Sequence, residues 1–213
     1  MAAPVAIEIV SDVICPWCFI GKRRLEKALA LLGGELEVQI AWLPFQLNPG
    51  MPAEGIARAD YRRAKFGEQR SRELDAHVAA EAAGEGLAFA LERQARTPNT
   101  FAAHQLIELA QERGVGEAVV EALFRAYFEQ ARDTGDRAVL RAVAAECGVA
   151  PDELEARWAD QADRRRVAQL EERMKALGIS GVPTFILGRR IAVSGAQPPE
   201  ALAAAIREAA APA

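Results

Sequence analysis

The N-terminal part of the chain alternates between segments that predict a strand, a helix and a second strand. Residues 5–10 are rich in β-branched side chains, and residues 36–42 alternate apolar and polar positions, as strands do. Between them, residues 20–32 place apolar side chains at helical spacing, after Pro16 and before Gly33. Because the order is strand, helix, strand, we expect the two strands to lie parallel in one sheet.

The middle of the chain, residues 44–177, predicts helices. Apolar stripes at three-and-four spacing recur along it, at 120–128, 139–147 and 167–177, and no strand pattern interrupts them. Pro98, Asn99 and Thr100 predict one of the helix starts, with a capping side chain. We therefore expect an all-helical segment between two strand-forming ends.

After Gly178 the chain returns to strand character. Residues 184–187 and 190–193 flank a tight turn and predict a hairpin, which a closing helix follows. The order βαβ, helices, ββα predicts an α/β protein with one sheet built from both ends of the chain. We expect a discontinuous domain of residues 1–43 and 178–213, into which residues 44–177 are inserted as a helical domain.

Composition and charge narrow the function classes. The chain has 213 residues and 26 Lys and Arg against 30 Asp and Glu, a net charge of -4, which disfavours nucleic acid as a partner. No uncharged apolar run reaches the roughly 18 residues of a membrane span. The first ten residues lack the basic and apolar regions of a signal peptide. We therefore expect a cytoplasmic protein with neither nucleic acid nor membrane as partner. Reductants in the cytoplasm normally keep thiols reduced.

The candidate chemistry centres on Cys15, Pro16, Trp17 and Cys18, at the predicted start of the first helix. Residues three apart share a helix face, so the two thiols can form a small disulfide. The free N–H groups and the positive end of the helix dipole favour a thiolate at Cys15, which predicts the nucleophile. Cys18 is then placed to attack the sulfur that Cys15 holds. An exposed Trp17 is expected to contact a thiol substrate.

Two other interpretations of this cysteine pair remain. A structural zinc site needs four ligands, and only Cys147, His77 and His104 remain as further soft ligands. Cys147 lies on an apolar stripe and His77 on a polar helix, so no metal site is expected. The other alternative is a purely structural disulfide between Cys15 and Cys18.

A second motif, GVPTF, lies late in the chain, where Pro183 precedes a strand at a position typical of a cis X-Pro bond. CPWC and GVPTF together resemble the thioredoxin superfamily, and the large helical insertion is similar to DsbA-type proteins. Within that group, a set of strings resembles the FrnE-like cytosolic branch, related to 2-hydroxychromene-2-carboxylate isomerase and kappa-class glutathione transferases. These strings are SDVICPWCFIG, PFQLNPG, PNTFAAHQL, LFRAYFEQARDTGD, GVPTF and VSGAQ. The resemblance covers nearly the whole chain and implies a thioredoxin fold with a helical insertion.

The resemblance also implies roles for single residues. Cys15 matches the nucleophilic cysteine, Cys18 the resolving cysteine and Pro183 the cis-proline. Val182, the residue before that proline, would offer its backbone to an extended substrate strand, a pairing that gives affinity with little sequence preference.

Four further residues also have expected roles. Asn99 and His104 could line the site from the helical domain; alternatively, Asn99 only caps its helix and His104 lies half-buried on the helix margin. Glu8 matches, with an offset of one residue, the buried carboxylate that shuttles protons in this superfamily. Asp12 is expected to shape the turn before Cys15 rather than to transfer protons.

The leading functional hypothesis is a thiol-disulfide oxidoreductase, an enzyme that exchanges disulfides with protein or small thiols through a mixed disulfide on Cys15. It needs no metal and no flavin, and glutathione is a possible co-substrate. The alternative is a glutathione-dependent isomerase or transferase of the 2-hydroxychromene-2-carboxylate isomerase type, although such enzymes lack the cysteine pair. A third hypothesis is a chaperone-like protein that holds unfolded chains. The chain would act as a monomer or homodimer, and its sequence leaves the direction of electron flow open.

Overall fold

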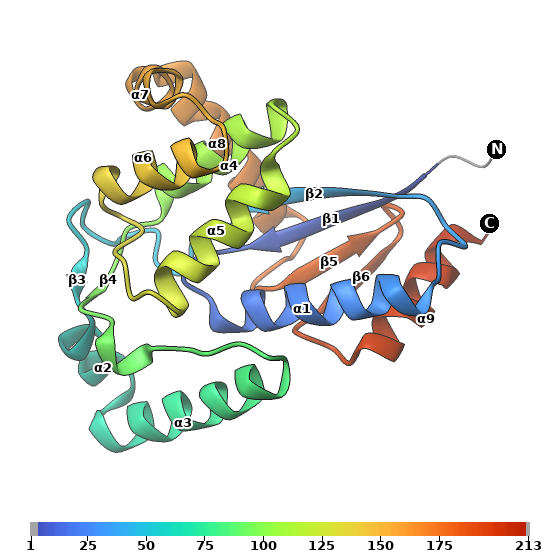
Figure 1. The fold of residues 1–213 in the computed structure, drawn as a ribbon, viewed down its shortest axis with the longest axis horizontal. Coiled ribbons are helices and arrows are strands. Elements are labelled where there is room, and N and C mark those ends of the chain that lie inside the picture. The colour runs from blue at the N-terminus through green and yellow to red at the C-terminus, as the bar shows by residue number, and fades with distance from the viewer. Residues whose placement is uncertain (1–3, 212–213) are drawn as a thin grey trace.

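The computed structural model describes residues 4–211, which fold around a four-stranded sheet (Figure 1). The strands are β1 (Val5–Ser11), β2 (Val38–Pro44), β3 (Ile56–Ala57), β4 (Arg96–Thr97), β5 (Thr184–Leu187) and β6 (Ile191–Ser194). The helices are α1 (Pro16–Leu31), α2 (Arg58–Phe66), α3 (Glu68–Gly84), α4 (Phe101–Glu112), α5 (Gly116–Phe128), α6 (Arg137–Glu146), α7 (Pro151–Ala159), α8 (Gln161–Ala176) and α9 (Pro199–Ala210), with a short 3-10 helix at Leu91–Arg93.

The main sheet takes its strands from both ends of the chain, in the order β2-β1-β5-β6. β1 pairs parallel with β2, with Val5 opposite Val38, and antiparallel with β5. β5 and β6 form a hairpin whose turn residues, Gly188 and Arg189, have φ values of 56° and 57°. The predicted α/β class, with its βαβ and ββα ends, is confirmed.

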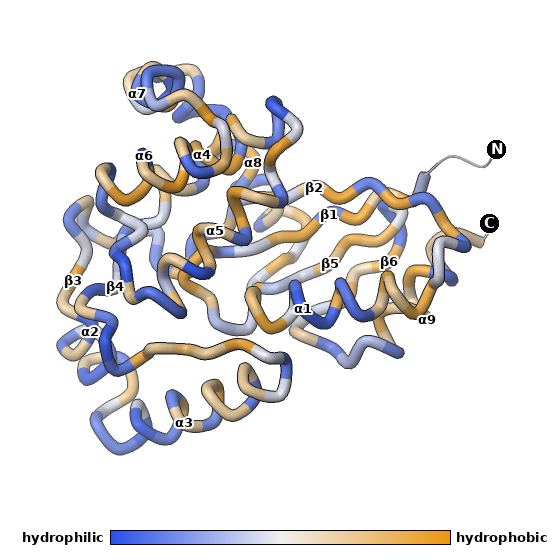
Figure 2. Tube along the Cα trace, viewed as in Figure 1, coloured by the Kyte–Doolittle hydropathy of each residue, from blue (hydrophilic) through white to orange (hydrophobic). Residues whose placement is uncertain are grey.

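The main core lies between the sheet and two helices that pack against each other, α1 and α9. Ile7, Ile9 and Phe185 point from the sheet into this core and are at most 1% exposed. Phe19 of α1 extends the core toward the helical segment, where its ring stacks on Phe124 of α5 at a centroid distance of 5.0 Å. Figure 2 shows the apolar stretches gathered along the central strands, with hydrophilic stretches toward the periphery. The core is thus continuous from the sheet to the helical segment.

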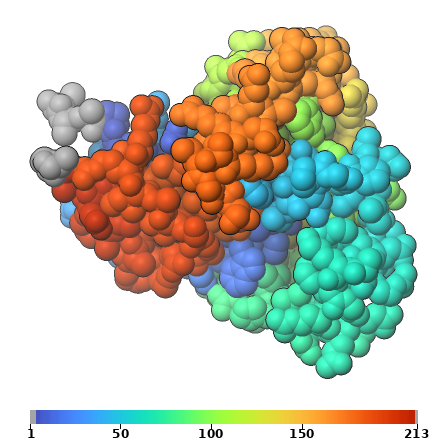
Figure 3. Space-filling view, turned by 180° about the vertical axis from the view of Figure 1, so that it is seen from behind, coloured from blue at the N-terminus to red at the C-terminus, as the bar shows by residue number. Residues whose placement is uncertain are grey.

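The opposite face of the sheet is covered by α8. Val10 of β1, Phe45 and Met174 of α8 form a small buried cluster there. Seen from behind, α8 lies beside the segment of β5, β6 and α9 (Figure 3). Successive side chains of a strand point to opposite faces, so Glu8 and Val10 point to the α8 side, away from Ile7 and Ile9.

Helix α4 closes the free edge of β2. The Gln111 side chain accepts from the Trp42 N–H at 2.7 Å and donates to the Trp42 carbonyl at 3.0 Å. One amide side chain therefore takes the place of a neighbouring strand, which protects an edge that could otherwise pair with another chain.

The structure corrects the expectation that residues 44–177 contain helices alone. β3 and β4 pair antiparallel, with Ile56 opposite Thr97, and the Arg96 guanidinium donates to the Glu54 and Gly55 carbonyls. Two-residue strands are too short to show a period of two in the sequence. The pair ties together the two ends of the segment that carries α2 and α3.

None of the helices between residues 4 and 211 is long and apolar enough to cross a membrane.

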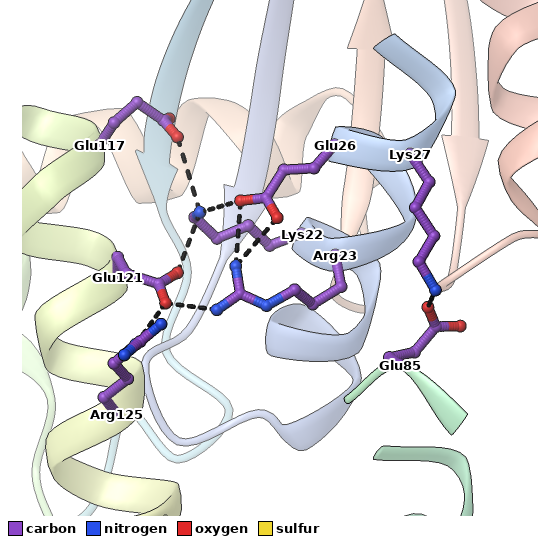
Figure 4. A network of polar contacts seen from close by, with 8 residues as sticks. All are labelled: Lys22, Arg23, Glu26, Lys27, Glu85, Glu117, Glu121 and Arg125. Atoms are coloured by element: carbon purple, nitrogen blue, oxygen red, sulfur yellow. Dashed lines mark hydrogen bonds and ion pairs between the residues drawn. The ribbon is translucent and has the colours of Figure 1, made fainter. Parts of the chain in front are cut away.

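A charged network joins α1 to α5 (Figure 4). Lys22, whose side chain is 7% exposed, lies between Glu26 of its own helix and Glu121 of α5, with 3.0 Å between its Nζ and a Glu121 oxygen. Arg23 and Arg125 also contact Glu121. Burial raises the pKa of Glu121, but the hydrogen bonds from Arg23, Arg125 and Lys22 outweigh it and lower this pKa from 4.5 to about 2.

The depressed pKa predicts how stability depends on pH. The contribution of ionised Glu121 to the free energy of unfolding is fully present above its unfolded pKa of 4.5. It is lost as pH falls toward the folded pKa of about 2. A Glu121→Gln variant should therefore be less stable than the parent by about 2 kcal/mol at pH 7. This difference should narrow between pH 4.5 and 2 in urea unfolding followed by circular dichroism.

The control is Glu73→Gln, because Glu73 pairs with Arg70 on an exposed face of α3. This variant should show a much smaller difference at pH 7. A difference for Glu121→Gln that stays constant from pH 7 to pH 2 would contradict the assigned role of the network.

Candidate active site

The two motif cysteines lie where β1 ends and α1 begins. The Cys15 N–H donates to the Asp12 carbonyl and the Cys18 N–H to the Cys15 carbonyl, both at 3.0 Å, so a tight turn joins strand and helix. Cys15 immediately precedes the helix, and Pro16, which has no N–H to satisfy, opens its first turn. This junction places Cys15 at the positive end of the α1 dipole.

The two free thiols differ in what they can reach. Both are buried, Cys15 at 4% and Cys18 at 1% exposure, but Cys15 lines a pocket and Cys18 does not. Burial raises the pKa of Cys18 well above its usual range, and so do the hydrogen bond and charge of Cys15; a hydrogen bond with the Ser11 side chain and one with the Asp12 backbone act in the opposite direction. A molecule in the pocket would meet Cys15 first, with Cys18 behind it.

The Cys15 thiol meets the loop that leads into β5. It donates to the Val182 carbonyl at a sulfur–oxygen distance of 3.6 Å, and the Val182–Pro183 peptide bond is cis, as the sequence predicts. Gly21 of α1 lies against this proline: a Cβ there would stand 3.0 Å from Pro183 Cγ and 3.3 Å from the Phe185 ring. The absence of a side chain at Gly21 therefore lets α1 approach the loop closely.

A pocket of about 390 Å³ opens beside Cys15, and α2 and α3 contribute much of its wall. In Figure 3, blue N-terminal residues reach the surface between the red C-terminal segment and the teal segment of α2 and α3. The size and apolar lining are typical of a site for a small molecule. The apolar and aromatic side chains of the wall are Ile14, Trp17, Leu47, Tyr61, Phe66, Leu74, Val78, Leu91, Tyr127, Phe128 and Val182.

The same pocket carries an excess of positive charge. Arg58, Arg62 and Lys65, all on α2, face a single carboxylate, Asp75 of α3. Asp75 binds Arg58 at 2.9 Å and Arg62 at 2.8 Å, while the Lys65 ammonium donates to the Tyr61 hydroxyl at 2.6 Å. Within residues 4–211, Lys65 pairs with no carboxylate. The pocket is thus suited to a ligand that carries negative charge.

The structure gathers most of the predicted site residues. Cys15, Trp17 and Val182 all line the pocket. The Trp17 ring lies 5.7 Å from the ring of His77 on α3, so it forms part of the wall and is only partly exposed. Pro183 lines a neighbouring groove of about 340 Å³ that continues to Ser194 of β6.

Asn99 and His104 take other positions. The Asn99 side chain accepts from the Phe101 N–H at 3.0 Å and donates to the Met51 carbonyl at 2.7 Å, so it organises the start of α4. His104 points into the interior, where it is 3% exposed and its Nε2 lies 3.6 Å from an Asp12 oxygen. Neither side chain lines the pocket beside Cys15, because Asn99 is bonded to Met51 and His104 faces the buried Asp12.

Glu8 is also misplaced for proton transfer to the cysteines. Its side chain points to the α8 side of the sheet, where it lines a groove with Met174 and Arg189. The offset of one residue in the sequence match explains this result, since a shift by one position along a strand moves a side chain to the other face.

The contribution of α2 to the pocket was not predicted from the sequence. Its string RADYRRAKF interleaves basic and aromatic residues, a pattern that also suits an ordinary solvated helix. All its residues are at least partly exposed, so hydrophobic periodicity gives no sign that one side of the helix faces a pocket.

Among residues 4–211, no cluster of three or more His, Cys, Asp or Glu side chains could hold a metal ion.

The fold and the position of the cysteine pair define a thioredoxin-like protein with a helical insertion. Residues 6–207 match the family described as DSBA-like thioredoxin domain, and the chain belongs to this family. The resemblance to DsbA-type proteins stated from the sequence is thus confirmed.

Three of the solved structures that resemble this chain illustrate its relatives. The probable DsbA oxidoreductase SCO1869 from Streptomyces coelicolor is 36% identical, with 96% of this chain and 89% of that chain covered and a TM-score of 0.87. A 2-hydroxychromene-2-carboxylate isomerase is 16% identical, with 95% of each chain covered and a TM-score of 0.71. The cytosolic disulfide reductase DsbM from Pseudomonas aeruginosa, solved with GSH, is 20% identical, with 95% of this chain and 98% of that chain covered and a TM-score of 0.68. The last two likenesses concern the fold.

Proposed function

We propose that this protein is a cytoplasmic thiol-disulfide oxidoreductase in which Cys15 is the nucleophile and Cys18 the resolving cysteine. The observation that supports this most strongly is the unequal placement of the two thiols. Cys15 lines the pocket at the start of α1, and Cys18 lies buried one turn further along the same helix. A substrate can then bond covalently to one sulfur only, and the second sulfur is held ready to displace it.

The exchange proceeds in two displacements. The Cys15 thiolate attacks one sulfur of a substrate disulfide, the substrate S–S bond breaks, and the released thiolate takes a proton from solvent. Cys18 then loses its proton and attacks Cys15, so the mixed disulfide breaks, a Cys15–Cys18 disulfide forms and the second substrate thiol leaves. Two electrons pass from the protein dithiol to the substrate, and the reverse sequence oxidises a dithiol substrate.

The surroundings of Cys15 support its role in the first step. Free N–H groups at the start of α1 and the helix dipole stabilise negative charge on the sulfur. Pro16 contributes no N–H of its own at this end of the helix. The Val182 carbonyl orients the thiol at 3.6 Å, and the adjoining groove beside Pro183 offers room for an extended peptide.

The charge of the pocket favours acidic substrates. Three basic side chains of α2 against the single carboxylate of Asp75 leave net positive charge near the reacting sulfur. Glutathione, a small thiol with two carboxylates, is therefore the co-substrate that we propose to test first. Carboxylate-bearing aromatic compounds would satisfy the same wall, and an isomerase activity on such compounds is the alternative that the variants below distinguish.

The cysteine variants test the proposal directly. Cys15→Ser should abolish the reduction of insulin disulfides, because no other thiol lines the pocket. Cys18→Ala should accumulate a mixed disulfide on Cys15, which intact-mass spectrometry detects. Cys147→Ser is the matched control and should retain full activity, since Cys147 lies at the end of α6 against the core. Full activity of the Cys15→Ser variant would contradict the proposal. Isomerisation of a hydroxychromene carboxylate by the same variant would also contradict it.

A charge variant tests the substrate class. Lys65→Gln should raise the KM for oxidised glutathione about three- to fivefold, the effect of one exposed ion pair, with little change in kcat. The KM for the uncharged 2-hydroxyethyl disulfide should not change. Arg72→Gln on α3 is the control, because Arg72 is 74% exposed and lies outside the pocket. Equal effects of Lys65→Gln on both disulfides would contradict electrostatic recognition.

A further inference from the structure

Two buried titratable side chains lie together behind the turn that carries Cys15. Asp12 is 0% and His104 3% exposed, and 3.6 Å separates Asp12 Oδ1 from His104 Nε2. Neither of these two atoms has a hydrogen-bond partner among residues 4–211. Buried polar atoms are nearly always paired in folded proteins, so a facing pair of this kind calls for an explanation.

The Asp12–His104 pair is held next to the cysteines by the backbone. The Asp12 carbonyl accepts from the Cys15 N–H, and Asp12 Oδ2 accepts from the Leu47 N–H at 2.8 Å. These bonds fix one carboxylate oxygen and leave Oδ1 directed at the imidazole. Asp12 thus closes the turn with its backbone carbonyl and keeps one carboxylate oxygen free, whereas the sequence led us to expect a role in the turn and none in proton transfer.

A small cavity lies beside His104 of the pair and Ser11. Ser11 and His104 both line this cavity of about 10 Å³, which is room for about one water molecule. A hydrogen bond with the Ser11 side chain lowers the pKa of Cys18, so the two groups are neighbours. Ser11 thus neighbours the buried thiol and also lines the cavity that His104 lines.

The resolving step requires a proton acceptor at this place. Cys18 must lose its proton before it can attack, yet it is 1% exposed, and burial raises its pKa. Bulk water has no direct access to the sulfur. Glu8, the carboxylate that sequence matching suggests, lines the groove beside α8 and does not line the cavity.

We propose that Asp12 and His104 together accept the Cys18 proton, through Ser11, when Cys18 attacks the mixed disulfide. This inference rests on the proposed function. In the step, the Cys18 proton passes to the pair, the Cys15–substrate S–S bond breaks and the Cys15–Cys18 bond forms. The electron pair of the broken bond leaves with the substrate sulfur, which takes a proton from solvent.

Glu108 provides the way out to solvent. Glu108 lies one turn along α4 from His104 and lines the same cavity. Its side chain is 12% exposed, and its carboxylate oxygen is 3.9 Å from the guanidinium of the partly exposed Arg166. Burial raises the pKa of Glu108, while the charges of Arg166 and His104 lower it. The charged and titratable groups near the pair are Cys15 before α1, Cys18 of α1, Glu108 of α4 and Tyr127 of α5, while Arg166 of α8 contacts Glu108 and not the pair.

The experiment separates the two displacements with 5,5'-dithiobis(2-nitrobenzoate) as the probe. Attack by Cys15 releases one coloured thionitrobenzoate, and attack by Cys18 on the mixed disulfide releases the second. Stopped-flow absorbance on the reduced protein, in a Cys147→Ser background, therefore gives one rate for each cysteine. Both rates are measured from pH 6 to pH 10.

Asp12→Asn and His104→Gln should leave the first phase within about twofold of the parent and slow the second phase by at least about tenfold at pH 7, as loss of general-base assistance does. The difference should close at high pH, where hydroxide removes the Cys18 proton. Thr134→Val is the matched control, because Thr134 is also 0% exposed and its Oγ1 also lacks a partner among residues 4–211. It should alter neither phase.

A second phase within about twofold of the parent for both variants at every pH would overturn the inference. Slowing that is the same at every pH would also overturn it, because a purely structural defect has no reason to vanish when hydroxide is abundant. If Asp12→Asn loses first-phase amplitude through misfolding, His104→Gln decides the question. Failure of the proposed function has a separate signature, the absence of the first phase in the unsubstituted protein.

Discussion

The turn between β1 and α1 is the constraint on which the site depends. Two backbone hydrogen bonds, from Cys15 to Asp12 and from Cys18 to Cys15, fix where the strand stops and the helix starts. β1 is an inner strand of the sheet, with β2 on one side and β5 on the other, so this turn stands at the middle of the sheet. Cys15, at the end of this turn, therefore contacts the loop before β5, where its thiol donates to the Val182 carbonyl.

The helical segment supplies what the sheet does not. α4 packs against the edge of β2 through Gln111, and α5 is joined to α1 by the charged network around Lys22. α2 and α3 form the opposite wall of the pocket and bring its positive charge. One part of the insertion thus stabilises the site, and another part selects what enters it.

The elements that carry strong local signals could be predicted from the sequence. The strand–helix–strand start and the hairpin have clear periodicities, and the cis bond at Pro183 follows from the motif around it. The β3–β4 pair could not be predicted, because two residues show no period. The positions of Asn99 and His104 depend on contacts with Met51 and Asp12, which lie far away in the sequence, and no local pattern encodes those contacts. The basic side chains of α2 carried a weak signal, since a solvated helix has the same composition.

The central claim is that Cys15 and Cys18 form one reversible two-electron couple. Equilibration of the protein in glutathione buffers of stepped ratio, followed by acid quenching, alkylation and mass spectrometry, measures that couple directly. The account predicts a single transition between dithiol and Cys15–Cys18 disulfide, with a slope of about 30 mV per tenfold change, while Cys147 stays reduced. No Cys15–Cys18 disulfide at any ratio, or a stable glutathione adduct on Cys18 in place of Cys15, would contradict the account.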